Sequence, residues 1–164
     1  MLFRDAHVRD LPQIVSIYNS IIEGRMVTAD MQPVSEDERM TWFHTHSPGR
    51  RPLWMVENDK SEILGWVSLQ DFYGRPAYDG TAEISIYLHS DYRGQGWGRK
   101  ILNASILRCT SLRIHCLLAF IFAHNLPSLQ LFANAGFEEW GNLHDVAVMD
   151  GSPYSLKILG KKIQ

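Results

Sequence analysis

The sequence contains little cysteine, with only Cys109 and Cys116 among its 164 residues. Two cysteines at this spacing form neither a disulfide framework nor the ligand pattern of a zinc site, and their apolar neighbours predict buried free thiols. The chain lacks an apolar run of the roughly 18–20 residues that a membrane span needs. Its first residues carry charges too early for a signal peptide. We therefore expect a protein that holds no metal, enters no membrane and resides by default in the cytoplasm.

An excess of charge of one sign is absent as well. The formal net charge is −2, which provides no overall attraction to nucleic acid or to an anionic membrane surface. Hydrophobic residues make up 45% of the chain and charged residues 21%, as in an ordinary globular protein. A chain of this length is expected to form one domain, residues 1–164, around a single core.

Segments with a strand pattern and segments with a helix pattern follow one another along the chain. Strands are predicted over residues 2–6, 53–57, 63–72, 81–89, 116–122, 137–140, 145–149 and 155–161, and helices over 10–24, 35–46, 97–109 and 127–134. Asp10 and Ser35 are the predicted caps of the first two helices, and Gly65 predicts a bulge or a close approach inside a strand. This order predicts an α/β fold, with a mixed, mostly antiparallel sheet of six or seven strands flanked by about four helices.

Glycine and arginine are concentrated in one run between the strand over 81–89 and the helix over 97–109. The run is Arg93-Gly94-Gln95-Gly96-Trp97-Gly98-Arg99-Lys100. Glycines allow successive backbone N–H groups to converge on one point, and the following helix N-terminus adds positive partial charge there. The spacing fits neither a P-loop nor the dinucleotide fingerprint. The run therefore predicts an anion site, most simply for a phosphate; the alternative is a glycine-rich turn that only caps the helix.

The run resembles the pyrophosphate loop of the GNAT superfamily of N-acetyltransferases, Gln/Arg-x-x-Gly-x-Gly/Ala, with Arg93, Gly96 and Gly98 on the pattern. Two further stretches resemble the superfamily: Asn125 after an apolar strand, and Leu131-Phe132-Ala133-Asn134-Ala135-Gly136-Phe137. The resemblance implies acetyl-CoA as cosubstrate and two splayed central strands with the pantetheine arm between them. The cofactor-binding residues that it implies are Ile86, Tyr87, Leu88, Arg93, Gly94, Gln95, Gly96, Trp97, Gly98, Arg99, Asn125 and Ser128.

A narrower resemblance connects the chain to the phosphinothricin and methionine sulfoximine N-acetyltransferases. It rests on Tyr18-Asn19, Val27-Thr28, Gly74-Arg75-Pro76-Ala77-Tyr78 and Thr81-Ala82-Glu83. It implies transfer of an acetyl group to the amino group of a small amino acid or analogue, and a homodimer. Arg75 is the expected anchor for a substrate carboxylate, because its guanidinium fork matches a carboxylate bidentately. Tyr73, Tyr78, Asn19 and Thr28 are the other expected substrate contacts.

Glu83 is the candidate general base that would deprotonate the attacking amine, directly or through water. Alternation along its strand places four side chains on one face: Thr81, Glu83, Ser85 and Tyr87. A carboxylate in an otherwise apolar strand is costly unless it is solvated, paired or used in chemistry. The alternatives are a Glu on a solvated sheet face or an ion-pair partner of Arg75, and the alternative for Arg75 itself is a loop arginine in water.

The chain departs from the superfamily at Phe132, where many relatives have a Tyr and the narrower group often a His. Phe cannot protonate the leaving thiolate, although a thiolate is a tolerable leaving group near neutral pH. Tyr87 or water is the expected substitute. Two other functions stay open: an N-acetyltransferase that acts on a protein N-terminus or lysine, and a non-catalytic acyl-CoA-binding sensor, which the departure at Phe132 suggests.

Overall fold

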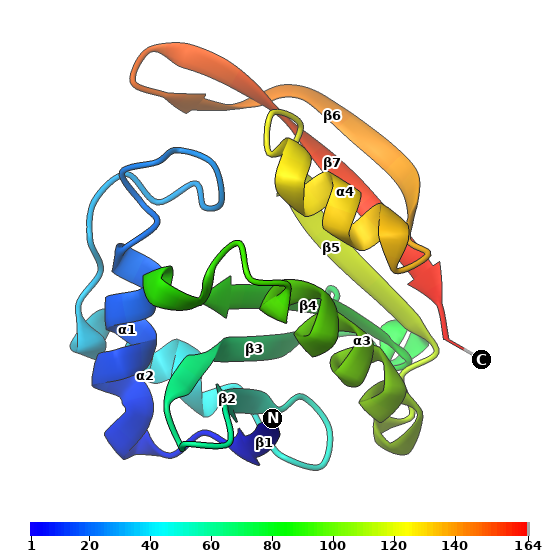
Figure 1. The fold of residues 1–164 in the computed structure, drawn as a ribbon. Coiled ribbons are helices and arrows are strands. Elements are labelled where there is room, and N and C mark those ends of the chain that lie inside the picture. The colour runs from blue at the N-terminus through cyan, green and yellow to red at the C-terminus, as the bar shows by residue number, and fades with distance from the viewer. Residues whose placement is uncertain (164) are drawn as a thin grey trace.

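The structure, a computed structural model, describes residues 1–163, which form one seven-stranded sheet with helices on both faces (Figure 1). The strands are β1 (Leu2–Asp5), β2 (Leu53–Glu57), β3 (Ile63–Asp71), β4 (Thr81–Leu88), β5 (Cys116–Phe122), β6 (Glu138–Met149) and β7 (Ser152–Lys162). The α-helices are α1 (Leu11–Asn19), α2 (Glu36–His44), α3 (Trp97–Cys109) and α4 (Leu126–Asn134). The strand count, the four helices and the mixed α/β class confirm the fold predicted from the sequence.

The sheet divides between β4 and β5. Its strand order is β1-β2-β3-β4-β5-β7-β6, and all neighbours are antiparallel except β4 and β5. These two strands pair in parallel over only three residues of β4, from Thr81 opposite Cys116 to Glu83 opposite Leu118. Beyond Glu83 they diverge (Figure 1), so one edge of β4 is left without a partner strand. The splay that the family resemblance implies is therefore present.

Two separate cores hold the helices against the two faces of the sheet. On one face α3 contributes the buried Ile101 and Leu102, which belong to the same cluster as Leu117 of β5. On the other face α1 packs Ile14 and other apolar residues against β2 and β3. Trp66 of β3 donates its indole N–H to the Ile14 carbonyl at 3.1 Å. Tyr87 of β4 packs on this α1 side, so odd-numbered residues of β4 face α1 and α2 while even-numbered residues face α3.

The prediction of two short strands over 137–140 and 145–149 is wrong, because β6 is one irregular strand paired to β7. Its register shifts between Glu139 and Gly141 and again between Leu143 and Ala147. Asp145 lies in the second irregularity with a φ of 51°, in the left-handed region. A bulge adds residues without ending the pairing, so the sequence pattern is interrupted where the strand itself continues.

The first helix also differs from the prediction. It ends at Asn19 rather than at Gly24, and the Asp10 side chain makes no capping bond to its N-terminus. The Asp10 carboxylate instead accepts two hydrogen bonds from Arg4, at 2.7 and 2.9 Å, and one from the His7 N–H. The Asp10 carboxylate is thus bound by an arginine from β1 and does not cap α1.

Close packing explains one glycine inside a strand. A Cβ on Gly65 would lie 2.1 Å from the Tyr87 carbonyl oxygen, so only glycine fits at this point between β3 and β4. This confirms the predicted close approach. No helix within residues 1–163 has both the length and the apolar character to cross a membrane.

Candidate active site

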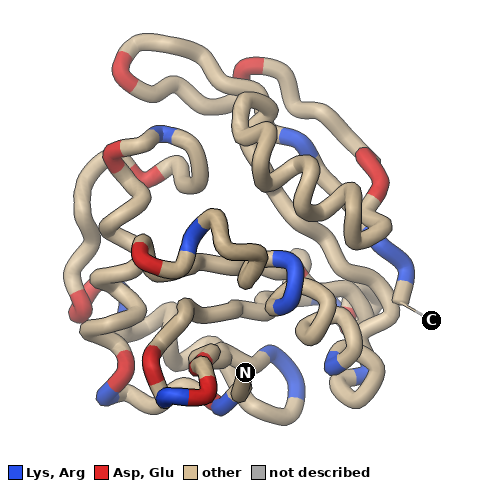
Figure 2. The backbone as a smooth tube through the Cα atoms, in the orientation of Figure 1, with Lys and Arg blue, Asp and Glu red and all other residues tan. Residues whose placement is uncertain are grey.

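The glycine run forms the turn from β4 into α3. Gly94 and Gly96 have φ values of 71° and 79°, in the region that favours glycine. Gly96 immediately precedes α3, whose first turn carries no acidic side chain. Figure 2 shows Lys and Arg positions at both ends of this turn. The unpaired N–H groups of the helix N-terminus and these cationic side chains together form a positively charged site suited to a phosphate or pyrophosphate.

A groove with a volume of about 440 Å³ runs from this turn along the open edge of β4. Nine of the predicted cofactor residues line it: Ile86, Tyr87, Leu88, Arg93, Gly94, Gly96, Gly98, Arg99 and Ser128. A smaller cavity of about 50 Å³ continues between the diverging strands, where Ile84 and Ser85 of β4 face Ala119, Phe120 and Ile121 of β5. The two hollows share Val27, Tyr87 and Phe132, so they form one continuous slot.

Gln95 and Trp97 lie in the turn but are not part of the groove lining. The Gln95 amide donates to the Asp91 carbonyl at 2.6 Å, and the Trp97 ring lies 4.5 Å from the Lys100 ammonium. Arg93 is held across the end of β4, since its guanidinium donates to the Leu88 carbonyl and to the Ser20 hydroxyl, each at 3.0 Å. These contacts stabilise the conformation of the turn.

Glu83 is the last residue of β4 that is paired with β5, so it lies where the slot begins. Its side chain is on the face of the sheet that carries Tyr87 and α1. Burial raises the pKa of the Glu83 carboxyl above its usual range, and no hydrogen bond or ion pair to another side chain within residues 1–163 offsets the effect. Burial also raises the pKa of the Tyr87 hydroxyl well above its usual range, which keeps this phenol protonated at neutral pH. A carboxylate with a raised pKa is well matched to accept a proton near neutral pH.

Phe132 of α4 is 6% exposed and lines both parts of the slot. Its ring packs edge-on against Phe137, with 4.9 Å between ring centroids. This wall of the slot is therefore apolar at the position where the superfamily often has a proton donor.

Arg75 lies in the exposed loop between β3 and β4, outside the groove lining. Within residues 1–163 its guanidinium has no ion-pair partner. Tyr73 and Tyr78 are also exposed, and they cluster with Phe72 at centroid distances of 4.6–6.0 Å. The structure thus places the three predicted anchors in one aromatic loop, with Arg75 free to meet an anion, and it does not bring them into contact with Glu83.

The base of this loop is held by an arginine that the sequence analysis missed. Arg51 is 2% exposed, lies 2.7 Å from the Asp71 carboxylate and donates to the Asp79 carbonyl at 2.7 Å and the Thr81 carbonyl at 3.2 Å. The Asp71 carboxylate also forms an ion pair with the Arg50 guanidinium, with 2.6 Å between Oδ2 and Nη1. Arg51 therefore ties the two ends of the loop together beside the first residue of β4, a role that only the tertiary fold reveals.

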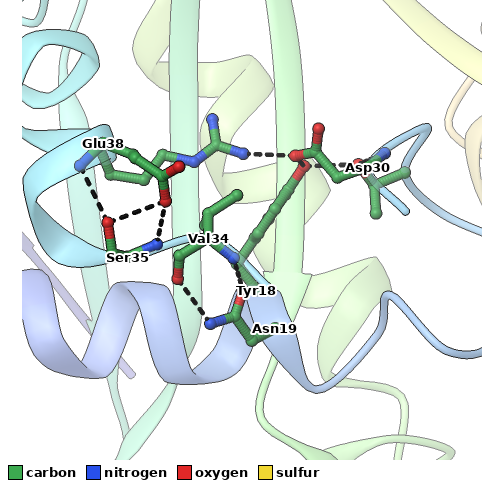
Figure 3. Close-up of polar contacts among 8 residues, drawn as sticks. Tyr18, Asn19, Asp30, Val34, Ser35 and Glu38 are labelled. Carbon is green, nitrogen blue, oxygen red and sulfur yellow. Dashed lines mark hydrogen bonds and ion pairs between the residues drawn. The ribbon is translucent and has the colours of Figure 1, made fainter. Parts of the chain in front are cut away.

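Asn19 and Thr28 act within the protein in this structure. The Asn19 amide makes hydrogen bonds of 2.9 and 3.0 Å to the backbone of Val34, which fasten the loop after α1 (Figure 3). The Thr28 hydroxyl hydrogen-bonds the Tyr18 hydroxyl. Tyr18 also donates to Asp30, as Figure 3 shows. Asn19 and Thr28 thus shape the segment that borders the slot. Val27, which belongs to the narrower resemblance but was not among the expected substrate contacts, is the residue of this segment that lines the slot itself.

Asn125 and Ser128 form the start of α4. The Asn125 side-chain oxygen accepts a hydrogen bond from the Ser128 N–H at 3.2 Å and its amide nitrogen donates to the Met26 carbonyl at 3.0 Å. Asn125 is 5% exposed and lines the inner cavity, whereas Ser128 lines both parts of the slot. Within residues 1–163 no three His, Cys, Asp or Glu side chains lie together in a way that would hold a metal ion.

Comparison with known proteins identifies the family. The model of the acetyltransferase (GNAT) family matches residues 14–137, which include most of α1, the slot and α4. The chain belongs to this family. It is therefore an N-acetyltransferase, and the resemblance stated from the glycine run is confirmed.

This GNAT acetyltransferase is similar to several proteins along nearly its whole length. It is 48% identical over 163 residues to Bacillus subtilis YwnH, which is named as a proposed phosphinothricin acetyltransferase, with 99% of each chain covered. It is 34% identical over 143 residues to an L-methionine sulfoximine/L-methionine sulfone acetyltransferase of Pseudomonas aeruginosa, covering 87% of this chain and 83% of the relative. A phosphinothricin acetyltransferase from Sinorhizobium meliloti, solved in complex with AcCoA, matches 99% of this chain and 88% of its own with a TM-score of 0.90 and 27% identity.

Proposed function

We propose that this acetyltransferase transfers the acetyl group of acetyl-CoA to the amino group of a small amino acid or analogue, such as phosphinothricin or methionine sulfoximine. The observation that carries the proposal is the open edge of β4 beyond Glu83, with a positively charged turn at one end and the half-buried Glu83 carboxylate at the other. The similarity to phosphinothricin and methionine sulfoximine acetyltransferases supports the substrate class.

Acetyl-CoA would occupy the slot in an orientation that the backbone chemistry favours. The pantetheine arm carries two amides, and over Ile86, Tyr87 and Leu88 the edge of β4 away from β3 has no partner strand. Backbone N–H and C=O groups that point to this edge would bind those amides, apart from the Leu88 carbonyl, which accepts from Arg93. The pyrophosphate would meet the turn over residues 93–99. The thioester then lies deeper in the slot, near Glu83.

The chemistry requires a neutral amine and a polarised thioester. Glu83 would accept a proton from the substrate ammonium, directly or through water, which frees the nitrogen lone pair. The nitrogen attacks the thioester carbonyl, and the resulting tetrahedral intermediate collapses as the C–S bond breaks and the amide forms. Because Phe132 offers no proton, the sulfur leaves as a thiolate or takes its proton from water or from the Tyr87 hydroxyl.

Substrate selection would fall to the aromatic loop. Arg75 would bind the substrate carboxylate bidentately, with Tyr73 and Tyr78 as flanking donors. Asn19 and Thr28 would border the acceptor pocket by holding the segment that contains Val27. An arginine that binds an α-carboxylate suits a free amino acid better than a peptide, in which an amide replaces that carboxylate.

We also propose that the protein forms a homodimer through β6. This edge strand exposes four large apolar side chains: Trp140, Leu143, Val146 and Val148. Val146 and Val148 are 57% and 68% exposed, and the strand has an unpaired edge, which is typical of a surface covered by another chain. Light scattering on the purified protein tests this assignment, and a monomer at micromolar concentration would contradict it.

The function is tested by release of free CoA from acetyl-CoA in a panel of amines. The panel contains phosphinothricin, methionine sulfoximine, methionine sulfone, the common amino acids and several N-terminal peptides. We expect activity confined to the amino acids and analogues. Activity on the peptides alone would favour a protein N-acetyltransferase. CoA binding by calorimetry without transfer to any amine would favour the acyl-CoA sensor.

A further inference from the structure

Residues 25–30, here named the brace, connect the two halves of the divided sheet. One end of the brace is fixed to the β5 half by two hydrogen bonds. His124, just after β5, donates from Nε2 to the Arg25 carbonyl at 2.7 Å, and Asn125 donates to the Met26 carbonyl at 3.0 Å. These contacts join residues about a hundred positions apart in the sequence, so they constrain the tertiary arrangement rather than the local turn.

The Arg25 side chain adds a third connection to the same half. Its Nε donates to the Asp150 carboxylate at 2.8 Å, at the tip of the β6–β7 hairpin, and its Nη1 donates to the Ile22 carbonyl at 2.8 Å. Arg25 has a φ of 51°, which a side chain other than glycine seldom adopts. The surrounding contacts hold this residue in an unfavourable conformation, as is typical of functional sites.

The other end of the brace is fixed to the α1 and α2 half. The Thr28 hydroxyl hydrogen-bonds Tyr18 of α1, and Asp30 accepts hydrogen bonds from Tyr18 and from Arg39 of α2, the latter at 2.8 Å (Figure 3). The Arg39 guanidinium also lies over the Tyr18 ring, 4.3 Å from its centroid. The brace therefore spans the opening that β4 and β5 leave between them.

Between its two fixed ends the brace presents Val27 to both parts of the slot. We propose that the brace sets the width of the slot and that His124 is a positioning residue, which acts on both substrates through Arg25 and Val27. The inference rests on the proposed function in that acetyl-CoA and the amine occupy the slot. Asn125 contributes to the same contact, because its amide joins the Met26 carbonyl to the Ser128 N–H.

The variant H124F tests the proposal with little change in packing. The His124 ring stacks on Phe122 and Tyr154, at centroid distances of 5.6 and 4.6 Å, and a phenyl ring preserves these contacts while it removes the N–H donor. We expect the KM for acetyl-CoA and the KM for the amine to rise about fivefold, the effect of one lost hydrogen bond, with kcat within about twofold of wild type. H124Q, whose amide nitrogen reaches the position of Nε2, is expected to recover most of the loss.

An exchange of charges provides a second test on exposed residues. R25D and D150R each place like charges at the Arg25–Asp150 contact, and we expect each to raise both KM values about threefold, as for an exposed ion pair. The double variant R25D/D150R restores opposite charges and is expected to return both values toward wild type. Failure of the double variant to recover would overturn the role of this contact.

Amide hydrogen exchange of the free protein gives a readout that does not depend on activity. We expect residues 25–30 to exchange about fivefold faster in H124F than in wild type, with residues 81–83 unchanged. Unchanged KM values together with unchanged exchange would overturn the proposal, as would a lower melting temperature with unchanged KM values. Faster exchange in H124F alongside a wild-type protein that acetylates no amine would instead contradict the proposed function and leave the brace in place.

Discussion

The two ends of β4 differ in their partners, and this difference separates structure from chemistry. At Ala82 and Glu83 the strand is paired with β3 on one side and with β5 on the other, and Thr81 before them is paired with β5, so this end forms part of a continuous sheet. Over Ile84 to Leu88 it keeps β3 on one side and has no partner strand on the other. The paired end holds the two halves of the sheet together, and the open end provides unpaired backbone groups for a ligand. Glu83 lies at the boundary, as the last residue of β4 that is paired with β5.

The largest effect is expected from E83Q, which changes the chemistry at the boundary and not the pairing. Removal of a general base costs about 10²- to 10⁴-fold in rate. Because burial raises the pKa of Glu83, wild-type kcat/KM should rise with pH through that pKa, and the variant should lose this acidic limb. Steady-state kinetics from pH 5 to 9 measures both the loss of rate and the change in the pH profile. CoA affinity should not change, and a wild-type rate in E83Q would remove Glu83 from the mechanism.

The next largest effect is expected from R75A, outside both ends of β4. Loss of a bidentate, charge-assisted contact to the substrate carboxylate should raise the KM for the amino acid about 10- to 100-fold and leave the KM for acetyl-CoA unchanged. R75K, which keeps the charge but not the bidentate fork, should have a KM for the amino acid between those of wild type and R75A. Equal effects of R75A on both substrates would show that Arg75 acts through the fold.

The variant G96A sharpens the role of the turn at the far end of the slot. An Ala at Gly96 meets no atom within 4 Å but must adopt a φ of 79°, which costs about 1–2 kcal/mol. We expect the KM for acetyl-CoA to rise about tenfold and the melting temperature to fall, measured by kinetics and thermal unfolding. The matched control is G49A, because a Cβ at Gly49 also meets no atom within 4 Å and Gly49 does not have a positive φ. G49A should change neither the KM for acetyl-CoA nor the melting temperature.

A smaller effect of E83Q is expected on the thermal stability of the protein. Burial raises the folded-state pKa of Glu83, so its protonated form supports the fold at low pH and that support is lost as pH rises through the folded pKa. E83Q should therefore match wild type in melting temperature near pH 4 and exceed it near pH 8, by about 2–4 °C for each kcal/mol relieved. Equal melting temperatures at pH 8 would show that Glu83 is well solvated.

The smallest effect is expected from F132Y, which adds a hydroxyl to the apolar wall of the slot. A thiolate is already a tolerable leaving group, so we expect kcat to rise by no more than about tenfold. A decrease in kcat, with unchanged acetyl-CoA binding, would show that the slot requires an apolar wall at Phe132.

Local patterns in the sequence were sufficient to predict most of the strands and the turn, whereas Glu83 as the base stays a prediction. Gly65, the Ser35–Glu38 capping box and the glycine run each act within a few residues, and the structure shows the close approach, the reciprocal cap and the turn. The roles of Asn19 and Asn125 were not accessible in the same way. Each amide bonds the backbone of a residue 15 or 99 positions away, so its partner is defined only by the fold.

The same limit applies to Arg51 and to β6. A pair of arginines before a strand gives no sign that the second will be buried against the Asp79 and Thr81 carbonyls. The irregular register of β6 divides its sequence pattern into two apparent strands, and only the pairing with β7 shows that they are one.

Residue-resolved amide exchange of β4, with and without acetyl-CoA, tests the central claim most directly. The account predicts that acetyl-CoA slows exchange over residues 84–88 and 93–100 and leaves residues 81–83 unchanged, because only the open end and the turn gain partners. Unchanged exchange over residues 84–88, under conditions in which acetyl-CoA is bound, would contradict it.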